Sequence, residues 1–359
     1  MAWQKRVLRV DLTKGTCNEE PLNMEWAMQY LGQRGLASRY LAEEIDPKVD
    51  ALSPENKLIM VTGPLTGTTA STGGRYSVVT KSPLTGAIAC SNSGGFIGAE
   101  MKNAGWDMFI FEGKSEKPVY LHVENLKAQL LSADELWGKS VWETDEILHN
   151  VHQDPLAKIA CVGRSAEQGC LYSGVINDLH RAAGRSGVGT VMASKQLKAV
   201  VVRGNLGVGN IDNPKAFLSA TAEAKKVLAE NAVTAEGLPQ MGTQVLMNVI
   251  NEVGAMPTRN FKEVQFEGAH KISAEAMHEP RESDGKPNLV TNAACFGCTI
   301  ACGRISTVDP KHYTIENKPE YMGASGGLEY ESAWSLGSDT GVDDLDALTY
   351  ANFICNEDG

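Results

Sequence analysis

The sequence predicts an α+β protein, in which a β-rich N-terminal domain over residues 1–208 precedes a mostly helical domain over residues 209–359. Two observations favour this class. Up to about residue 205, short runs of β-branched and apolar residues alternate with glycine turns, as expected for a sheet with tight connections. After residue 211 the periodicity becomes helical, beginning with a stretch rich in alanine, lysine and glutamate.

The individual elements follow from the same patterns. Strands are expected at 6–11, 57–62, 76–80, 108–112, 119–123, 158–162 and 199–202. Helices are expected at about 24–45, 133–152, 180–194, 216–230, 242–253, 272–278 and 344–357. Before the first helix of the second domain, Asn213 is a good N-cap and Pro214 suits the first helical position.

Composition excludes some classes of function. The formal net charge of −11 argues against a nucleic-acid partner. No apolar leader and no run of about 18 apolar residues is seen, so no membrane span is expected. Apart from one cluster, the cysteines are scattered and show no paired framework, which fits a reducing cytoplasm.

Three cysteines within eight residues form the most informative motif. Cys295, Cys298 and Cys302 make a C-x2-C-x3-C run, and on a helix their thiols would lie on one face. Gly297 and Gly303 leave room for a bulky inorganic group. Three thiolates facing one point suit an iron–sulfur cluster whose fourth ligand comes from elsewhere. Zinc is a rival although no second ligand pair is present, and buried structural thiols are another.

Three polar, glycine-containing loops are candidates for binding an anion. They are Thr72-Gly73-Gly74-Arg75, Ser91-Asn92-Ser93-Gly94-Gly95 and Arg181-Ala182-Ala183-Gly184-Arg185-Ser186-Gly187-Val188-Gly189. Backbone N–H groups ahead of a helix and arginine forks are suited to phosphate. The alternative for each loop is a tight turn with a solvated arginine. Together with the cysteine motif, the three loops favour an anionic redox cofactor.

These residues carry a family resemblance. The run Val61-Thr62-Gly63-Pro64-Leu65-Thr66-Gly67, then Arg75, Lys81-Ser82-Pro83-Leu84-Thr85-Gly86, the two later loops and the cysteine motif resemble aldehyde:ferredoxin oxidoreductase. The resemblance covers essentially the whole chain, in the correct order. It implies an N-terminal domain of two β-sheets that forms a saddle for a tungsten or molybdenum bis-pyranopterin cofactor (molybdopterin), covered by two mostly helical domains.

The resemblance also implies roles for particular residues. Cofactor binding is expected for Arg75, Asn92, Ser93, Gly94, Gly95, Arg181, Ala182, Ala183, Gly184, Arg185 and Asn356. The backbone carbonyls of Asn92 and Ala182 are expected to help hold a magnesium ion between the pterin phosphates. Cys295, Cys298 and Cys302 are the expected ligands of a [4Fe-4S] cluster. Glu331 is expected near the metal, as a proton acceptor or a group that positions water. Its alternative is a surface carboxylate or a helix N-terminal charge.

Two family features are missing from this sequence. The family's fourth cluster cysteine and its catalytic histidine lie beyond residue 359, so a fragment or one piece of a split enzyme is expected, with the C-terminal helical domain absent. Asn356 stands where the family often has aspartate. Cys355 is a possible fourth ligand, but its stretch looks like a buried helix, which disfavours it.

The expected reaction is oxidation of an aldehyde to a carboxylic acid, with electrons passing through the cluster to ferredoxin or a ferredoxin-like iron–sulfur subunit. The substrate is a small aldehyde, and a homo-oligomer or hetero-oligomer is expected. Two alternatives stay open, because fold and cofactor do not fix the reaction. One is a related pterin enzyme that reduces a carboxylic acid or an aromatic thioester. The other is a plain iron–sulfur electron-transfer protein.

Overall fold

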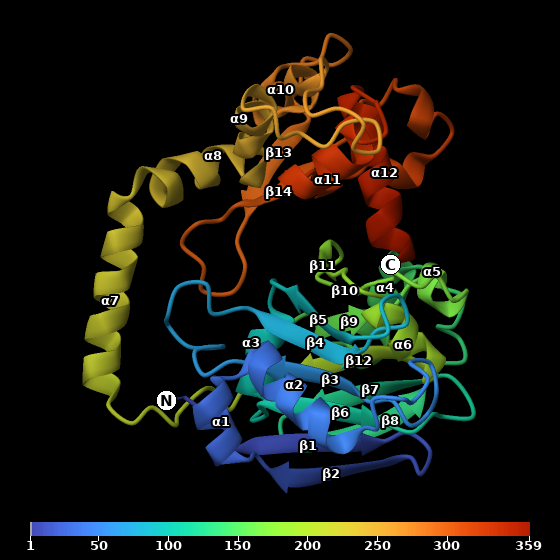
Figure 1. Ribbon diagram of the computed structural model, residues 1–359, viewed down its shortest axis with the longest axis vertical. Coiled ribbons are helices and arrows are strands. Elements are labelled where there is room, and N and C mark those ends of the chain that lie inside the picture. Colours follow the sequence, from blue (N-terminus) through green and yellow to red (C-terminus); the bar gives the residue numbers. More distant parts are fainter. Residues whose placement is uncertain (1) are drawn as a thin grey trace. The chain divides into compact units, whose positions relative to one another are not determined.

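The computed structural model describes residues 2–359, which divide into two compact units (Figure 1). The β unit comprises the chain up to Ala222 together with Cys295–Gly297 and Glu357–Gly359. The helical unit comprises Glu223–Ala294 and Cys298–Asn356. The α+β class is confirmed. The predicted domain ranges, 1–208 and 209–359, stay predictions.

The β unit contains two six-stranded sheets. The first has the order β2 (Thr16–Pro21), β1 (Arg6–Asp11), β6 (Met108–Glu112), β3 (Leu58–Thr62), β4 (Tyr76–Lys81), β5 (Ile88–Ser93). The second has the order β11 (Arg181–Ala183), β10 (Val175–Asn177), β9 (Lys158–Cys161), β12 (Leu197–Arg203), β7 (Val119–Glu124), β8 (Lys127–Ser132). Strands β1 and β6 pair in parallel, as do β7 and β12, and the other neighbours are antiparallel.

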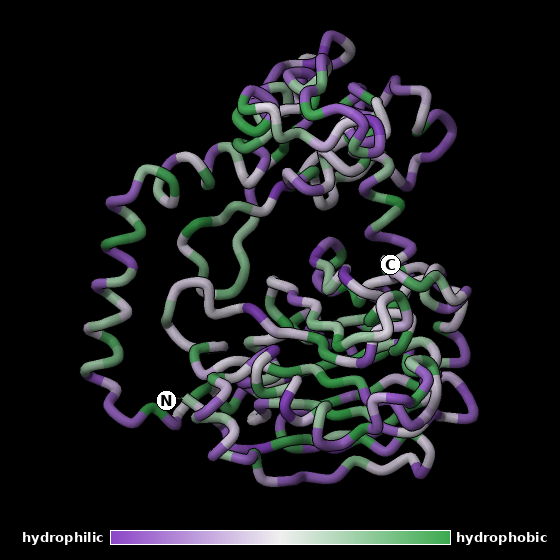
Figure 2. The backbone as a smooth tube through the Cα atoms, in the orientation of Figure 1, coloured by the Kyte–Doolittle hydropathy of each residue, from purple (hydrophilic) through white to green (hydrophobic). Residues whose placement is uncertain are grey.

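Both faces of each sheet are covered, so the central strands are apolar along their whole length. In β3, Leu58 and Met60 enter the core shared by the two sheets, while Ile59 and Val61 enter a second core beneath the helices α1 and α2. Strand β12 divides in the same way between the shared core and a third core beneath α4. Figure 2 shows this as mainly hydrophobic colouring along the strands.

Within residues 2–359, seven α-helices lie in the β unit or link it to the helical unit. They are α1 (Met24–Tyr30), α2 (Gln33–Glu44), α3 (Ile97–Asn103), α4 (Val141–His152), α5 (Arg164–Glu167), α6 (Val188–Ser194) and α7 (Pro214–Glu230). The last of these begins in the β unit and ends in the helical unit. The predicted cap of α7 is confirmed, because the side chain of Asn213 accepts a hydrogen bond from the backbone nitrogen of Ala216 at 3.0 Å.

Three of the predicted helices differ clearly from the structure. The helix expected over 133–152 begins only at Val141, because residues 134–138 form turns. The helix expected over 24–45 is interrupted at Leu31 and Gly32, which have φ of 61° and 108°. A Cβ on Gly32 would lie only 2.7 Å from the Trp3 ring, so the chain passes too close to that ring for a larger residue. The helix expected over 180–194 begins instead with strand β11, and α6 starts at Val188.

The helical unit is built from short helices around one core and a small antiparallel sheet. The α-helices are α8 (Leu238–Met241), α9 (Leu246–Glu252), α10 (Ala274–His278), α11 (Tyr330–Ala333) and α12 (Leu345–Asp358). The short 3-10 and π segments are η1 (Val233–Gly237), η2 (Thr243–Val245), η3 (Ala269–Ile272), η4 (Tyr313–Ile315), η5 (Pro319–Tyr321) and η6 (Trp334–Ser338). The sheet has the order β13 (Leu289–Ala293), β14 (Gly303–Ser306), β15 (Ser325–Gly326). None of the helices within residues 2–359 combines the length and apolarity that a bilayer crossing would need.

Candidate functional site

The first candidate loop is positioned by the pairing of β4 and β5. Their antiparallel register places Tyr76 opposite Ser93, so Arg75, which comes directly before β4, lies beside the end of β5. Nη1 of Arg75 donates to Oδ1 of Asn92 at 2.6 Å, and Nδ2 of Asn92 donates to the carbonyl of Tyr76 at 3.0 Å. The Arg75 side chain is exposed. The structure therefore brings together two predicted phosphate-binding residues and leaves the guanidinium accessible.

The third candidate loop, which begins at Arg181, borders the other two. Strand β11 packs against β5, and the backbone nitrogen of Arg185 donates to Oγ of Ser91 at 2.9 Å. Ala182, Gly184 and Arg185 are exposed, while Arg181 is half-buried. Within the β unit, the predicted residues before β4, at the end of β5 and around β11 thus form one contiguous polar surface with two exposed arginines.

A buried polar network beneath these loops was not predicted from the sequence. Oδ1 of Asn177 accepts from the Tyr76 hydroxyl at 3.1 Å and from Oγ of Ser93 at 2.8 Å. Its Nδ2 donates to the carbonyl of Gly94 at 3.1 Å and to Oδ2 of Asp178 at 2.7 Å. The same oxygen of Asp178 accepts from the backbone nitrogen of Phe96 at 2.9 Å. One asparagine and one aspartate therefore tie the turn at 93–96 to the second sheet.

The position of Asn177 and Asp178 directly before the His180–Arg181 loop was the only sequence signal for this network. Asp178 and the next residue, Leu179, have left-handed backbone with φ of 49° and 63°, and the Asp178 carboxylate bonds to the turn at 93–96. Burial, with a smaller contribution from Arg181, lowers the pKa of His180 to about 4. His180 is therefore neutral at pH 7 beside the candidate phosphate-binding arginines.

Cys295 lies against the turn that ends β5. The backbone nitrogen of Phe296 donates to the carbonyl of Gly95 at 3.1 Å. A Cβ on Gly94 would come within 2.7 Å of the Cys295 sulfur, and a Cβ on Gly74 would lie 2.6 Å from the Gly95 carbonyl. Glycine is therefore required at both positions, because a side chain there would collide with these atoms. The thiol of Cys295 is a suitable ligand for iron. This contact places a predicted cluster ligand beside a predicted phosphate-binding loop.

The cysteine motif is not helical. Its residues form the loop between β13 and β14, and Gly297 and Ala301 have φ of 63° and 53°, which no α-helix accommodates. The argument that a helix would place the three thiols on one face is therefore wrong. Cys295 belongs to the β unit, and Cys298 and Cys302 belong to the helical unit. Within residues 2–359, no three His, Cys, Asp or Glu side chains are gathered as a metal site. The assignment of the three cysteines as cluster ligands stays a prediction.

The remaining predicted residues lie in the helical unit. Glu331 is exposed in the first turn of α11, where a carboxylate interacts favourably with the helix dipole. Asn356 is half-buried in the last turn of α12. Cys355 is exposed, although the helix on which it lies buries Leu348 and Phe353. The functional roles of Glu331 and Asn356 stay predictions.

A cavity of about 490 Å³ adjoins the arginine before β4. It is lined by segments 30–35, 63–66 and 71–73. Gln33, which has φ of 43°, connects this cavity to the loops: its Nε2 donates to the carbonyl of Arg75 at 3.2 Å, and its Oε1 accepts from Nδ2 of Asn92 at 3.2 Å. Gln33 was not predicted as a site residue. The sequence feature that could have indicated it is the preceding residue, Gly32.

Two family models together match most of the chain. Residues 7–204 match the family model described as "Aldehyde ferredoxin oxidoreductase, N-terminal domain", and residues 219–359 match "Aldehyde ferredoxin oxidoreductase, domains 2 & 3". The tungsten-containing aldehyde ferredoxin oxidoreductase of Pyrococcus abyssi is 46% identical over 357 residues, which are 99% of this chain and 56% of that protein. The chain thus spans little more than half the length of the curated relatives that it matches.

Two more distant similarities are to proteins with other names. The aliphatic sulfonate oxidoreductase, WOR-like subunit, of Pyrococcus furiosus is 27% identical over 375 residues, covering 100% of this chain and 57% of that protein. Among solved structures, the active site complex BamBC of benzoyl coenzyme A reductase, with bound 1,5-dienoyl-CoA, contains a similar chain. The TM-score is 0.83 at 27% identity, over 100% of this chain and 53% of the other.

Proposed function

Because this chain belongs to the aldehyde ferredoxin oxidoreductase family, we propose that it binds a tungsten or molybdenum bis-pyranopterin and a [4Fe-4S] cluster, and that it oxidises aldehydes to carboxylic acids. One observation carries the proposal. Cys295 lies against Gly94, in the loop that also holds Asn92 and therefore Arg75. A cluster ligand in contact with a phosphate-binding loop suits an enzyme in which a redox cofactor and a cluster exchange electrons over a short distance.

In this proposal the residues of the β unit bind the cofactor and the cofactor supplies the redox chemistry. Arg75, Arg181 and Arg185 bind the pterin phosphates through charge-assisted hydrogen bonds, and the backbone of Ser93, Gly94, Gly95, Ala183 and Gly184 approaches the cofactor closely. The carbonyls of Asn92 and Ala182 suit a magnesium ion between the phosphates, because magnesium prefers oxygen ligands. Asn356 completes the set from α12.

The remaining groups would handle electrons and protons. Cys295, Cys298 and Cys302 supply three thiolate ligands to the cluster. Glu331 accepts the proton released when water is added to the aldehyde carbon. Oxidation of an aldehyde with water to an acid releases two electrons and two protons. A cluster held by these cysteines would supply one-electron transfer, and a ferredoxin or a ferredoxin-like iron–sulfur subunit would be the acceptor.

A second candidate function is a reduction at the same kind of centre. It is favoured by the 27% identity to a subunit of a sulfonate oxidoreductase and to a chain of a benzoyl coenzyme A reductase complex. Both names also describe assemblies with further subunits, and we expect a homo-oligomer or hetero-oligomer here. We place the enzyme in a reducing cytoplasm, since none of the cysteines within residues 2–359 forms a disulfide.

The proposal is tested by Arg75→Ala. Loss of a charge-assisted bond to phosphate costs about 1.5–3 kcal/mol, so about a tenfold to hundredfold weaker hold on the pterin is expected. The measurement is the pterin released on acid denaturation of anaerobically purified protein. Arg6→Ala is the matched control. Arg6 lies on β1, three strands from β4 in the first sheet, and pairs with Glu19 on β2. Equal pterin content in the Arg75 variant and its parent would contradict the assignment.

A further inference from the structure

Gln33 and Asn92 form a closed ring of hydrogen bonds with Arg75. Nε2 of Gln33 donates to the carbonyl of Arg75 at 3.2 Å. Oε1 of Gln33 accepts from Nδ2 of Asn92 at 3.2 Å, and Oδ1 of Asn92 accepts from Nη1 of Arg75 at 2.6 Å. The ring therefore starts at the backbone of Arg75 and returns, through two side-chain amides, to the guanidinium of the same residue.

The chemistry of Arg75 fixes the direction of every bond in this ring. A backbone carbonyl only accepts and a guanidinium only donates, so each amide has one orientation in which both of its ring bonds are made. If the amide of Gln33 were reversed, its oxygen would face the Arg75 carbonyl and its nitrogen would face Nδ2 of Asn92. The carbonyl of Tyr76, which accepts from Nδ2 of Asn92 at 3.0 Å, favours the same orientation of Asn92. The guanidinium is thus bonded to an amide whose orientation is fixed.

Gln33 is the one member of the ring that comes from outside strands β4 and β5 and the residue before them. It is the first residue of α2, and its φ of 43° is in the left-handed region. A residue with a side chain is held in this region only where its surroundings determine it. In this conformation the amide of Gln33 reaches both Arg75 and Asn92, so the strained backbone and the ring occur together.

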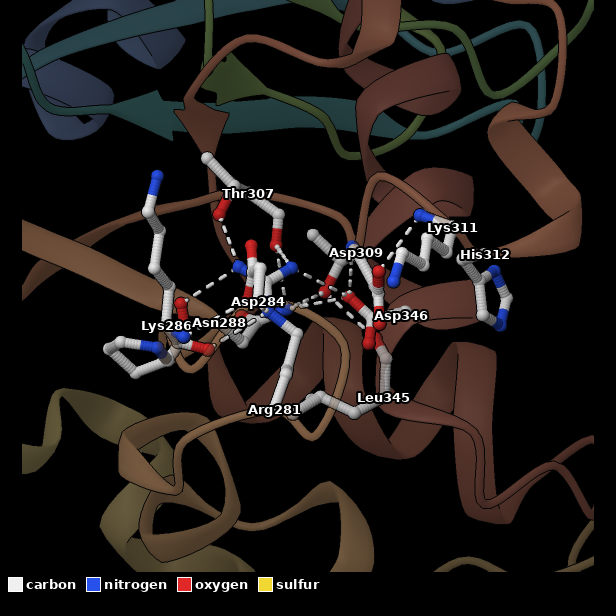
Figure 3. Close-up of polar contacts among 12 residues, drawn as sticks. Arg281, Asp284, Lys286, Asn288, Thr307, Asp309, Lys311, His312, Leu345 and Asp346 are labelled. Carbon is white, nitrogen blue, oxygen red and sulfur yellow. Dashed lines mark hydrogen bonds and ion pairs between the residues drawn. The ribbon is translucent and has the colours of Figure 1, made fainter.

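Arg281 of the helical unit shows the opposite arrangement (Figure 3). Its side chain is 9% exposed, and its guanidinium donates to the carbonyls of Lys286 and Pro287, each at 3.0 Å, and to Oγ1 of Thr307 at 2.8 Å. The guanidinium of Arg281 is therefore used within the protein. Arg75 is exposed and is held in the ring through Nη1, so the rest of its guanidinium is accessible to an anion.

We propose that Gln33 is a positioning residue for phosphate binding: through Asn92 it fixes the guanidinium of Arg75 in the orientation that binds a phosphate group of the pterin. The inference rests on the proposed function and adds to it a residue outside the three candidate loops. A guanidinium binds phosphate best through two parallel N–H···O bonds, and both form only if its rotation is restricted. A guanidinium that is ordered before binding does not lose this freedom during binding, so the phosphate is held more tightly.

The test is the rate at which anaerobically purified holoprotein loses pterin after dilution, measured as pterin in the filtrate. Gln33→Met keeps the length of the side chain and removes both of its ring bonds. This variant should lose pterin about three to ten times faster than the parent, which is the effect of about one neutral hydrogen bond. Gln153→Met is the matched control and should lose pterin at the parent's rate. Gln153 also has left-handed backbone, with φ of 51°, and donates to the carbonyl of Asn150 at 2.6 Å, but it lies at the end of α4.

A double-mutant cycle with Asn92→Ala separates positioning from general support of the fold. Asn92→Ala opens the ring beside the guanidinium and keeps the backbone carbonyl. Adding Gln33→Met to this variant should therefore accelerate pterin loss by less than about twofold. An equal acceleration by Gln33→Met in both backgrounds would show that Gln33 supports the fold only, and would overturn the inference.

A second variant guards against a misplaced methionine. Gln33→Ala adds no bulk and should accelerate pterin loss as Gln33→Met does, with a melting temperature close to that of the parent. Pterin loss at the parent's rate in both Gln33 variants would also overturn the inference. A parent protein that contains no pterin would overturn the proposed function as well, so the two failures are distinguishable.

Discussion

Asn177→Ala tests whether the buried network beneath the cofactor loops holds the two sheets of the β unit together. Asn177 is 1% exposed, and its amide makes four hydrogen bonds to the first sheet, the turn after β5 and Asp178. Truncation leaves three groups without this partner: the Tyr76 hydroxyl and Oγ of Ser93 in the first sheet, and the Gly94 carbonyl in the turn after β5. Each stranded buried group costs about 1–3 kcal/mol.

Relaxation of the site and entry of water will recover part of this cost. We therefore expect Asn177→Ala to lower the free energy of unfolding of the β unit by about 3–5 kcal/mol. The assay is urea unfolding followed by circular dichroism. Asn150→Ala is the matched control, because Asn150 is exposed on α4, and its effect should stay within about 0.5 kcal/mol. A loss below about 1 kcal/mol for Asn177→Ala would refute the reasoning.

Two further predictions concern buried titratable groups in the β unit. The pKa of His180 is about 4 in the folded protein and about 6.5 in the unfolded chain, so the unfolded chain binds the proton first as the pH falls. The free energy of unfolding should therefore fall by about 2 kcal/mol between pH 7 and pH 5. His180→Gln should abolish this part of the decrease, as measured by urea titrations at the two pH values. An equal decrease in the variant and its parent would contradict the assignment. Lys102 and Asp107 form a fully buried ion pair at 2.6 Å, so Asp107→Asn should cost about 3–5 kcal/mol by leaving the ammonium unpaired. Adding Lys102→Met should recover part of that loss in thermal melts, and a double variant no more stable than Asp107→Asn would argue against the pair.

The fold was predictable where the pattern of apolar residues reports burial directly. The central strands β3, β6 and β12 are buried on both faces and therefore appear in the sequence as continuous apolar runs. The edge strand β2 was missed because its sequence, Thr16-Cys17-Asn18-Glu19-Glu20-Pro21, is polar and half exposed. This strand forms because it pairs with β1, and its own residues do not show a strand pattern.

The candidate site was predictable only in its loops. Arg75, Asn92 and Arg185 stand in glycine-rich segments that can be recognised along the chain. The groups that position these residues cannot be recognised in this way. Asn177 and Gln33 reach the loops through left-handed backbone at neighbouring residues and through strand pairing between distant segments. The cysteine motif was recognised, but its loop conformation depends on positive φ at Gly297 and Ala301.

The most direct test of the account is elemental analysis of the protein purified without exposure to oxygen. The account predicts tungsten or molybdenum in the same preparation as iron, together with releasable pterin. A plain iron–sulfur protein would contain iron alone. Iron without tungsten or molybdenum, or a protein devoid of all three metals, would contradict the central claim that Arg75, Arg181 and Arg185 bind a metal-carrying pterin beside a cluster.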